Sequence, residues 1–132
     1  FDAVDEAGQA IYHTNVILSV GDKFALVCLD SIQNDEDQER ILESLNHTGH
    51  RIIAISYEQM HRFAGNVLQV KSKQNQPYLL LSQQALDSIL PGQIHEITLH
   101  VDLLPVQIPT IEKYGGGGIR CMVAGVHQKR HI

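Results

Sequence analysis

Two side chains that lie far apart in the sequence have the types needed for covalent catalysis. Cys121 follows four consecutive glycines at residues 115–118. Glycine has no β-carbon, so such a run makes sense where the backbone turns sharply or closely approaches another group. His13 stands at the mouth of an apolar run, in the stretch Tyr12-His13-Thr14-Asn15. A cysteine and a histidine remote in sequence form one pattern of nucleophilic catalysis, in which a thiolate attacks carbon and an imidazole moves protons.

Each of these residues also has a structural interpretation. A four-glycine run is typical of a flexible surface loop, and many cysteines are inert buried thiols. A histidine at the start of a strand is often a surface or capping residue. The second cysteine, Cys28, is embedded in Leu26-Val27-Cys28-Leu29 and is predicted to belong to the core.

The composition fits one ordinary globular domain. The chain has 132 residues, of which 43% are hydrophobic and 19% charged, so disorder is not expected. The net charge of −5 and the absence of a basic stripe with aromatics argue against nucleic acid, since the only cationic cluster is Lys129-Arg130. No apolar run is long enough to span a membrane, and no signal-peptide pattern opens the chain. Two cysteines make no disulfide framework, which predicts a reducing, cytoplasmic setting.

The same order of elements is predicted twice. In the first pass, strands at 15–20 and 24–29 are joined by a hairpin through Gly21-Asp22. A helix follows, with the acidic start Asn34-Asp35-Glu36-Asp37, an apolar stripe and Gly49 as its end. Residues 51–56 are predicted to form the strand that ends this first repeat.

The second pass repeats the order strand, strand, helix, strand. Strands are predicted at 67–71 and 78–81, with Asn75-Gln76-Pro77 as the turn. Ser82 caps a short helix that Pro91-Gly92 stops, and residues 97–103 alternate apolar and polar side chains as a strand does. Both passes together favour an α/β fold of repeated ββαβ units.

A repeat of about 50 residues suits a mixed α/β unit arranged around an axis. We expect units at about residues 12–65 and 66–114, followed by a final strand at about 119–127 that begins a third pass. Two units and one strand do not close a ring, and the chain begins Phe1-Asp2-Ala3-Val4 without methionine. The sequence therefore predicts a fragment of a longer protein. The alternative is that two halves of an ordinary α+β domain look alike by chance.

The chain resembles the guanidino-group-modifying superfamily, which includes arginine and agmatine deiminases, dimethylargininase and the amidinotransferases. The sequence of its matching stretches looks most similar to that of the citrulline-utilization hydrolase-like branch. Position 118, commonly serine or asparagine in relatives, is here Gly118. The resemblance covers most of the chain and is strongest in three stretches: Ile11-Tyr12-His13-Thr14-Asn15-Val16, Phe63-Ala64-Gly65-Asn66, and Ile108-Pro109-Thr110-Ile111-Glu112-Lys113-Tyr114 running into the glycines and Cys121.

This resemblance implies a five-bladed α/β propeller, pentein-like, with its active site in the central channel. Residues 1–132 would be the carboxy-terminal portion of a single catalytic domain, and the partner would be the missing amino-terminal half of the same protein. It also implies an amidine hydrolase that acts on a small guanidino or ureido compound of the arginine, agmatine, methylarginine or citrulline type. No cofactor is expected.

The resemblance assigns catalysis to Cys121 as nucleophile and to His13 as general acid and base. An imidazole suits both duties because its unperturbed pKa, about 6.5, lies near working pH. Asn66, Gly117 and Gly118 are predicted substrate-binding residues, although Asn66 equally well shapes a turn. Glu112 is expected to be a solvent-exposed carboxylate at a helix start.

The remaining histidines show no ligand spacing of a structural zinc site, so no metal is predicted. His100 and Asp102 would share a strand face, which we expect to be the solvated one. These histidines are His47, His50, His61, His95 and His100, with His127 and His131 in the polar tail.

Two other functions remain open from the sequence. An amidinotransferase would use the same Cys121 and His13 and differ only in the amine that resolves the adduct. A non-catalytic half-propeller would assemble with a partner chain or as a homo-oligomer, because exposed strand edges tend to pair.

Overall fold

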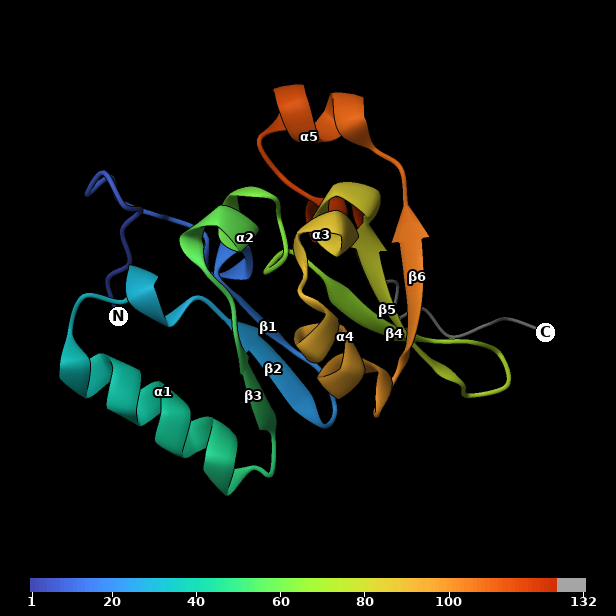
Figure 1. Ribbon diagram of the computed structural model, residues 1–132, viewed down its shortest axis with the longest axis horizontal. Helices are drawn as coiled ribbons and strands as arrows, with labels where there is room; N and C mark the ends of the chain where they lie inside the picture. Colours follow the sequence, from blue (N-terminus) through green and yellow to red (C-terminus); the bar gives the residue numbers. More distant parts are fainter. Residues whose placement is uncertain (126–132) are drawn as a thin grey trace.

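The computed structural model describes residues 1–125, which form a mixed α/β structure around two three-stranded sheets (Figure 1). The first sheet contains β1 (Leu18–Val20), β2 (Phe24–Val27) and β3 (Arg51–Ala54), in that order. β1 and β2 are antiparallel, whereas β2 and β3 are parallel. The parallel pair needs a crossover, which α1 (Asp35–His47) supplies.

The second sheet has the same order and the same pairing. It contains β4 (Leu68–Lys71), β5 (Pro77–Ser82) and β6 (Asp102–Val106), with an antiparallel and then a parallel pair. Its crossover holds two helices, α3 (Gln83–Ser88) and α4 (Pro91–Thr98).

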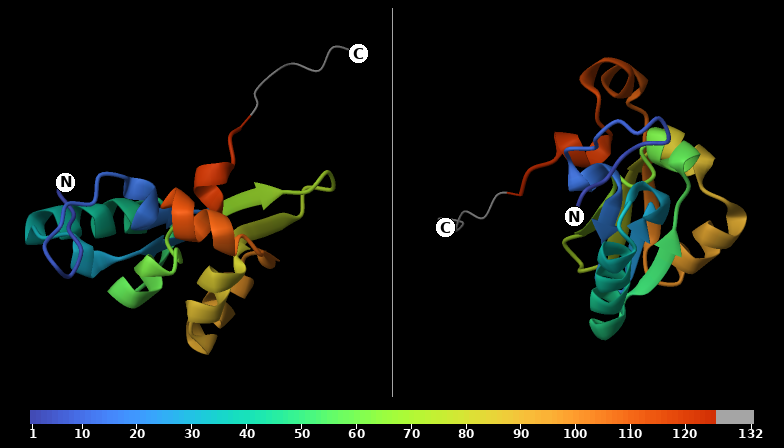
Figure 2. Two further views of the ribbon diagram at one scale, coloured as in Figure 1. Left: turned by 90° about the horizontal axis from the view of Figure 1, so that it is seen from above. Right: turned by 90° about the vertical axis from the view of Figure 1, so that its left-hand side faces the viewer.

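Shorter elements connect and flank the sheets. α2 (Tyr57–His61) leads from the first sheet to the second, and α5 (Pro109–Gly115) follows β6 at the top of the view in Figure 1. Three 3-10 helices complete the set: η1 (Thr14–Val16), η2 (Leu29–Ser31) and η3 (Ile119–Met122). Figure 2 shows η1 and η3 on the same side of the molecule, although they come from opposite ends of the chain.

Local capping explains where several of these helices begin and end. The Asn34 side chain accepts from the backbone N–H groups of Glu36 and Asp37, as an N-cap should, and Gly49 beyond α1 has the left-handed φ of +78°. Ser82 caps α3 by accepting from the Ala85 N–H at 3.0 Å. The predicted starts of both helices are confirmed.

The core is built from the inner faces of both sheets and the helices on them. All four residues of β2 are buried, which fits a central strand covered on two sides. The largest fully buried side chains include the following residues: Phe24, Ile17, Leu26, Ile32, Leu79, Leu81 and Ile97. Polar contacts also cross between the sheets, because the Ser19 hydroxyl of β1 donates to the Val67 carbonyl at 2.8 Å.

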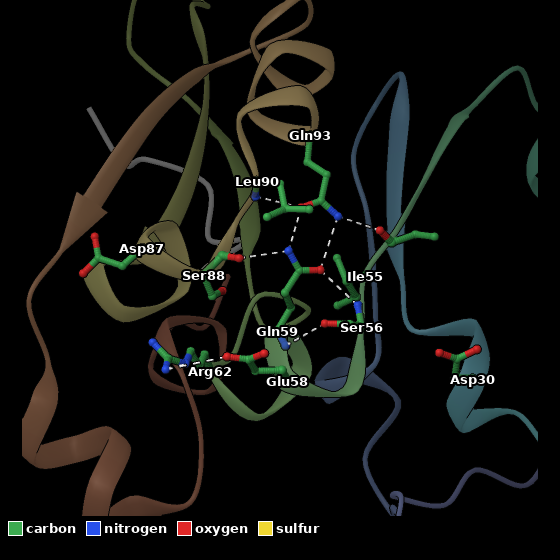
Figure 3. A pocket seen from close by; sticks show the side chains of 11 residues that line it. Asp30, Ile55, Ser56, Glu58, Gln59, Arg62, Asp87, Ser88, Leu90 and Gln93 are labelled. Carbon is green, nitrogen blue, oxygen red and sulfur yellow. Dashed lines mark hydrogen bonds and ion pairs between the residues drawn. The ribbon is translucent and has the colours of Figure 1, made fainter.

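Two glutamines join α2 to the helices of the second sheet (Figure 3). Gln59 Nε2 donates to the Ser88 carbonyl at 2.9 Å and to Gln93 Oε1 at 2.6 Å. Gln93 Nε2 donates to the Ala54 carbonyl at 2.7 Å, and Gln93 Oε1 accepts from the Leu90 N–H. Gln59 is only 6% exposed, so this network is part of the packed junction.

The strand expected at 97–103 is wrong. Pro91 does not stop a helix but occupies the first turn of α4, where its missing N–H costs nothing. The Gln93 side chain caps this turn, and the helix continues through Thr98 before β6 begins at Asp102. His100 therefore lies outside the strand, where its ring stacks on Phe24 at a centroid distance of 5.9 Å.

The expected final strand also differs from the structure over its described part. Residues 119–122 form the 3-10 helix η3 rather than a strand. Gly118 enters this helix in an extended conformation, and Val123 leaves it extended. The rest of the expected strand, together with His127 and His131, lies outside the described residues.

No helix within residues 1–125 has the length and apolar character needed to cross a membrane.

The glutamine junction gives a stability prediction. We expect Gln59→Ala to lower the free energy of unfolding by about 1–3 kcal/mol, because it leaves buried polar partners unpaired. The matched control is Gln84→Ala on the exposed side of α3, which should change stability by less than about 0.5 kcal/mol. Urea unfolding followed by circular dichroism measures both. Equal effects of the two substitutions would contradict the role of this network.

Candidate active site

Cys121 lies in η3 with two side-chain amides directed at its sulfur. Asn66 Nδ2 donates to Cys121 Sγ at 3.3 Å, and Asn15 Nδ2 approaches the same sulfur at 3.8 Å. Cys121 is an exposed residue with a free thiol. The thiol thus faces hydrogen-bond donors on one side.

Asn66 is the centre of this arrangement. Its side chain is completely buried, and its Nδ2 also donates to the Asn15 carbonyl at 2.7 Å. Its Oδ1 accepts from the Cys121 N–H at 3.4 Å. One amide group therefore holds together three segments, around residues 15, 66 and 121.

A tight turn after α2 places Asn66 in the interior. Phe63 adopts a left-handed φ of +64°, which is uncommon for an aromatic residue. The turn is held by backbone bonds from the Ala64 N–H to Gln59 and from the Asn66 N–H to Phe63. Gly65 packs directly on the Val16 carbonyl, where a β-carbon would overlap the oxygen. This contact brings Asn66 beside the residue 15 segment.

The glycines before Cys121 are required by close approach and by a turn. Gly116 ends α5 in the left-handed region at φ +70°. A β-carbon on Gly117 would lie 2.8 Å from Cys121 Sγ. One on Gly118 would lie 2.8 Å from Asn66 Oδ1 and 2.9 Å from Phe63 Cβ. The predicted close approach is present, and its observed partners are Cys121, Asn66 and Phe63.

His13 lies immediately before η1 and is exposed. It is two residues from Asn15, whose amide contacts the sulfur. The structure therefore brings the segment that carries His13 next to Cys121, as Figure 2 shows for η1 and η3.

Asn15 is a site residue that the sequence patterns did not indicate. Its Nδ2 reaches the sulfur, while its Oδ1 is buried and accepts no hydrogen bond from any described residue. A buried acceptor without a partner is costly, and this oxygen has no access to solvent in the structure. The signal was its place two residues after His13, which puts it near the predicted nucleophile.

Cys28 has the opposite environment, as predicted. It is completely buried within the core, and burial raises the pKa of its thiol. A thiol that resists ionisation and has no exposed surface is not a nucleophile.

Glu112 is not the exposed carboxylate that the sequence predicted. It is 7% exposed, and its Oε2 accepts from the Ser82 hydroxyl at 2.8 Å. Since Ser82 also caps α3, this bond fastens α5 to the start of α3. The segment that leads to the glycines is thereby fixed at its beginning.

Two of the other described histidines, His50 and His61, form side-chain hydrogen bonds. His50 bridges Thr48 Oγ1 at 2.7 Å and the Gly21 carbonyl at 2.9 Å. His61 lies 2.7 Å from Glu6 Oε2, and this hydrogen bond lowers the pKa of the Glu6 carboxyl. Within residues 1–125, no group of three or more His, Cys, Asp or Glu side chains is arranged to hold a metal ion.

The largest described cavity, about 590 Å³, does not include Cys121 or His13 among its lining residues. It lies between α2 and the α3–α4 pair, with Gln59 and Gln93 at its centre (Figure 3). These two amides bond to each other and to backbone groups, so their polar atoms already have partners. Size alone therefore does not identify the reactive site, and the chemistry of the side chains favours Cys121.

Comparison with known families adds independent evidence. The family model described as N,N dimethylarginine dimethylhydrolase, eukaryotic, matches residues 1–128. The chain belongs to this family. The match supports the guanidino-group-modifying superfamily and a hydrolase that acts on C–N bonds, while the citrulline-utilization branch stays a prediction. A comparison with curated proteins gave no match.

The packing of Gly118 gives a prediction for the site. Gly118→Ala introduces a methyl group against Phe63 Cβ and Asn66 Oδ1, so we expect a loss of stability of about 1–3 kcal/mol. It should also change the alkylation rate of Cys121 by iodoacetamide, because the displaced Asn66 no longer donates to the sulfur. The control is Gly92→Ala in α4, where a β-carbon meets nothing and helix propensity improves. An unchanged alkylation rate and melting temperature in Gly118→Ala would contradict this account.

Proposed function

We propose that the chain carries the nucleophile and the general acid–base of an amidine hydrolase, which works through a covalent adduct on Cys121. The observation that supports this most directly is the buried Asn66 amide, which contacts the Cys121 sulfur, the Cys121 N–H and the Asn15 carbonyl. A structural cysteine has no need of an exposed sulfur with two amide donors. The family match supports the reaction class.

The proposed reaction has two stages. The Cys121 thiolate adds to the amidine carbon, the C–N bond to the leaving amine breaks, and His13 gives its proton to that nitrogen. Water then adds to the same carbon and gives a proton to His13, after which the C–S bond breaks and its electron pair returns to sulfur. The resonance-stabilised carbon reacts more easily in two steps than in one.

The two asparagine amides would stabilise negative charge on the sulfur at the start and end of this cycle. Hydrogen bonds to an ionised acceptor are roughly twice as strong as neutral ones. In the same proposal, guanidino and ureido groups both offer the electrophilic carbon that the Cys121 thiolate attacks. The substrate is then a small compound of the arginine, agmatine, methylarginine or citrulline type.

We further propose that the two sheets are ββαβ units of a five-bladed propeller and that an amino-terminal half of the same protein completes the channel. Matching strand order and pairing in the two sheets support this proposal. Residues of that half would hold most of the substrate, so residues 1–125 alone do not define which guanidino or ureido compound is used. Identification of the substrate would assign the chain to either the citrulline-utilization or the dimethylargininase branch of the superfamily.

The catalytic proposal is tested in the protein that contains both halves. We expect Cys121→Ser to remove turnover of guanidino and ureido substrates, measured as release of ammonia or alkylamine. His13→Ala should lower kcat by about 10²–10⁴-fold, the usual contribution of a general acid–base. Mass spectrometry of a rapidly quenched reaction of the unsubstituted protein should find a covalent adduct on Cys121, and none in Cys121→Ser.

Cys28→Ala is the matched control, because it removes the other thiol and should leave kcat within a factor of about three if the protein stays folded. Normal turnover in folded His13→Ala would remove that residue from the mechanism. Transfer of the group to an added acceptor amine, in place of hydrolysis, would assign the amidinotransferase reaction instead. A folded complete protein without turnover on any of these substrates would favour the assembly function.

A further inference from the structure

A second cavity, of about 240 Å³, is lined by the buried Glu112 and shares Arg62 and Asp87 with the cavity at the glutamine junction. Its lining includes Gln83 and Asp87 of α3 and Gln107 and Ile108 before α5. Neither Cys121 nor His13 lines it. Ligand pockets for drug-sized molecules usually measure about 300–1,000 Å³, so this cavity suits a small molecule.

The charge of Glu112 is not balanced by the protein around it. The carboxylate is 7% exposed and accepts one hydrogen bond, from a neutral serine hydroxyl, at Oε2. Among the described residues, no lysine, arginine or histidine forms an ion pair with it, and none donates to Oε1. Oε1 is not among the fully buried acceptors that lack a partner, so it keeps access to the surface of the cavity. Glu112 lines the cavity, so its free oxygen is open to a ligand there.

The rest of the lining favours an organic cation over a metal ion or an anion. Asp87 adds a second carboxylate, which is held by the Gln83 amide at 2.8 Å. Arg62, the cation of the lining, is exposed and forms an ion pair of 3.8 Å with Glu58, as Figure 3 shows. Ile108 and Pro109 give one wall an apolar surface, which suits an alkyl stem and gives a bare metal ion no ligands.

We propose that this cavity is a binding site for a small alkylammonium or alkylguanidinium ion, with the cationic head on Glu112 and the stem against Ile108 and Pro109. The site is separate from the proposed active site. It lies on α5, however, whose far end leads through the glycines to Cys121. This proposal does not depend on the proposed hydrolase activity, because it involves neither Cys121 nor His13.

The test measures binding of butylguanidinium to the Cys121→Ser chain by ¹H–¹⁵N NMR titration, with butylurea as an uncharged analogue of the same shape. We expect saturable shifts at the backbone amides of Ser82, Ala85 and Glu112 with butylguanidinium and none with butylurea. Glu112→Gln keeps the shape and an acceptor for Ser82 but removes the charge, so binding should weaken about tenfold or more. The control is Glu39→Gln on exposed α1, which should bind as the parent does.

A second variant keeps the proposal testable if Glu112→Gln does not fold. Arg62→Gln removes the like charge from the lining, so cation binding should strengthen about two- to fivefold. Shifts confined to Asn15, Asn66 and residue 121 would place the cation in the proposed active site and overturn this inference. Equal binding of butylurea, or weaker binding by Arg62→Gln, would overturn it as well.

Discussion

The arrangement of this chain around Cys121 depends on one buried amide. A primary amide that is removed from water loses strong hydrogen bonds, and each unmatched donor or acceptor costs about 1–3 kcal/mol. Asn66 meets this requirement only when the residue 15 segment and the residue 121 segment are both at hydrogen-bond distance. The hydrogen bonds of Asn66 therefore fix the distance between the residue 15 segment and the residue 121 segment. Burial of Asn66 also requires a tight turn, in which Phe63 adopts a left-handed conformation. On either side of Asn66, Gly65 and Gly118 pack so closely on their neighbours that a β-carbon would not fit.

The two cysteines show how the same fold assigns different chemistry to one side chain. Cys28 is enclosed by apolar neighbours, where burial disfavours the charged thiolate and raises its pKa. Cys121 lies at the surface, on a 3-10 helix that follows glycines, and two amide groups point at its sulfur. The difference arises from the backbone around each residue. Cys28 lies between the buried strand β2 and η2, where the core covers it completely, whereas Cys121 follows the glycine segment and is exposed.

Sequence patterns predicted those parts of the fold that have local causes. The Asn34 and Ser82 caps and the buried strand around Leu26 were found because each signal lies within a few residues of the element it controls. The alternation of apolar and polar residues at 97–103 led to the wrong prediction of a strand. Pro91 and the Gln93 cap favour a helix instead, and this helix continues through the first part of that pattern. The burial of Glu112 and the contacts of Asn15 could not be predicted. Both depend on partners, Ser82 and Cys121, that only the tertiary structure brings close.

The segment from Glu112 to Cys121 is held at both ends by polar contacts and contains four glycines between them. Its beginning is held by the buried Glu112–Ser82 bond, and its end by the Asn66–Cys121 contacts. Between them lie four glycines, which have the largest conformational freedom of any residue. Ordering such a run costs conformational entropy. The two buried polar contacts offset that cost, because Ser82 and Asn66 would each lose a hydrogen-bond partner if the segment moved away. The backbone between them is also held by the bond from the Arg120 N–H to the Asn66 carbonyl and by the packing of Gly118 on Phe63. We therefore expect the position of the sulfur to depend more on these buried contacts than on the exposed side chains of the segment.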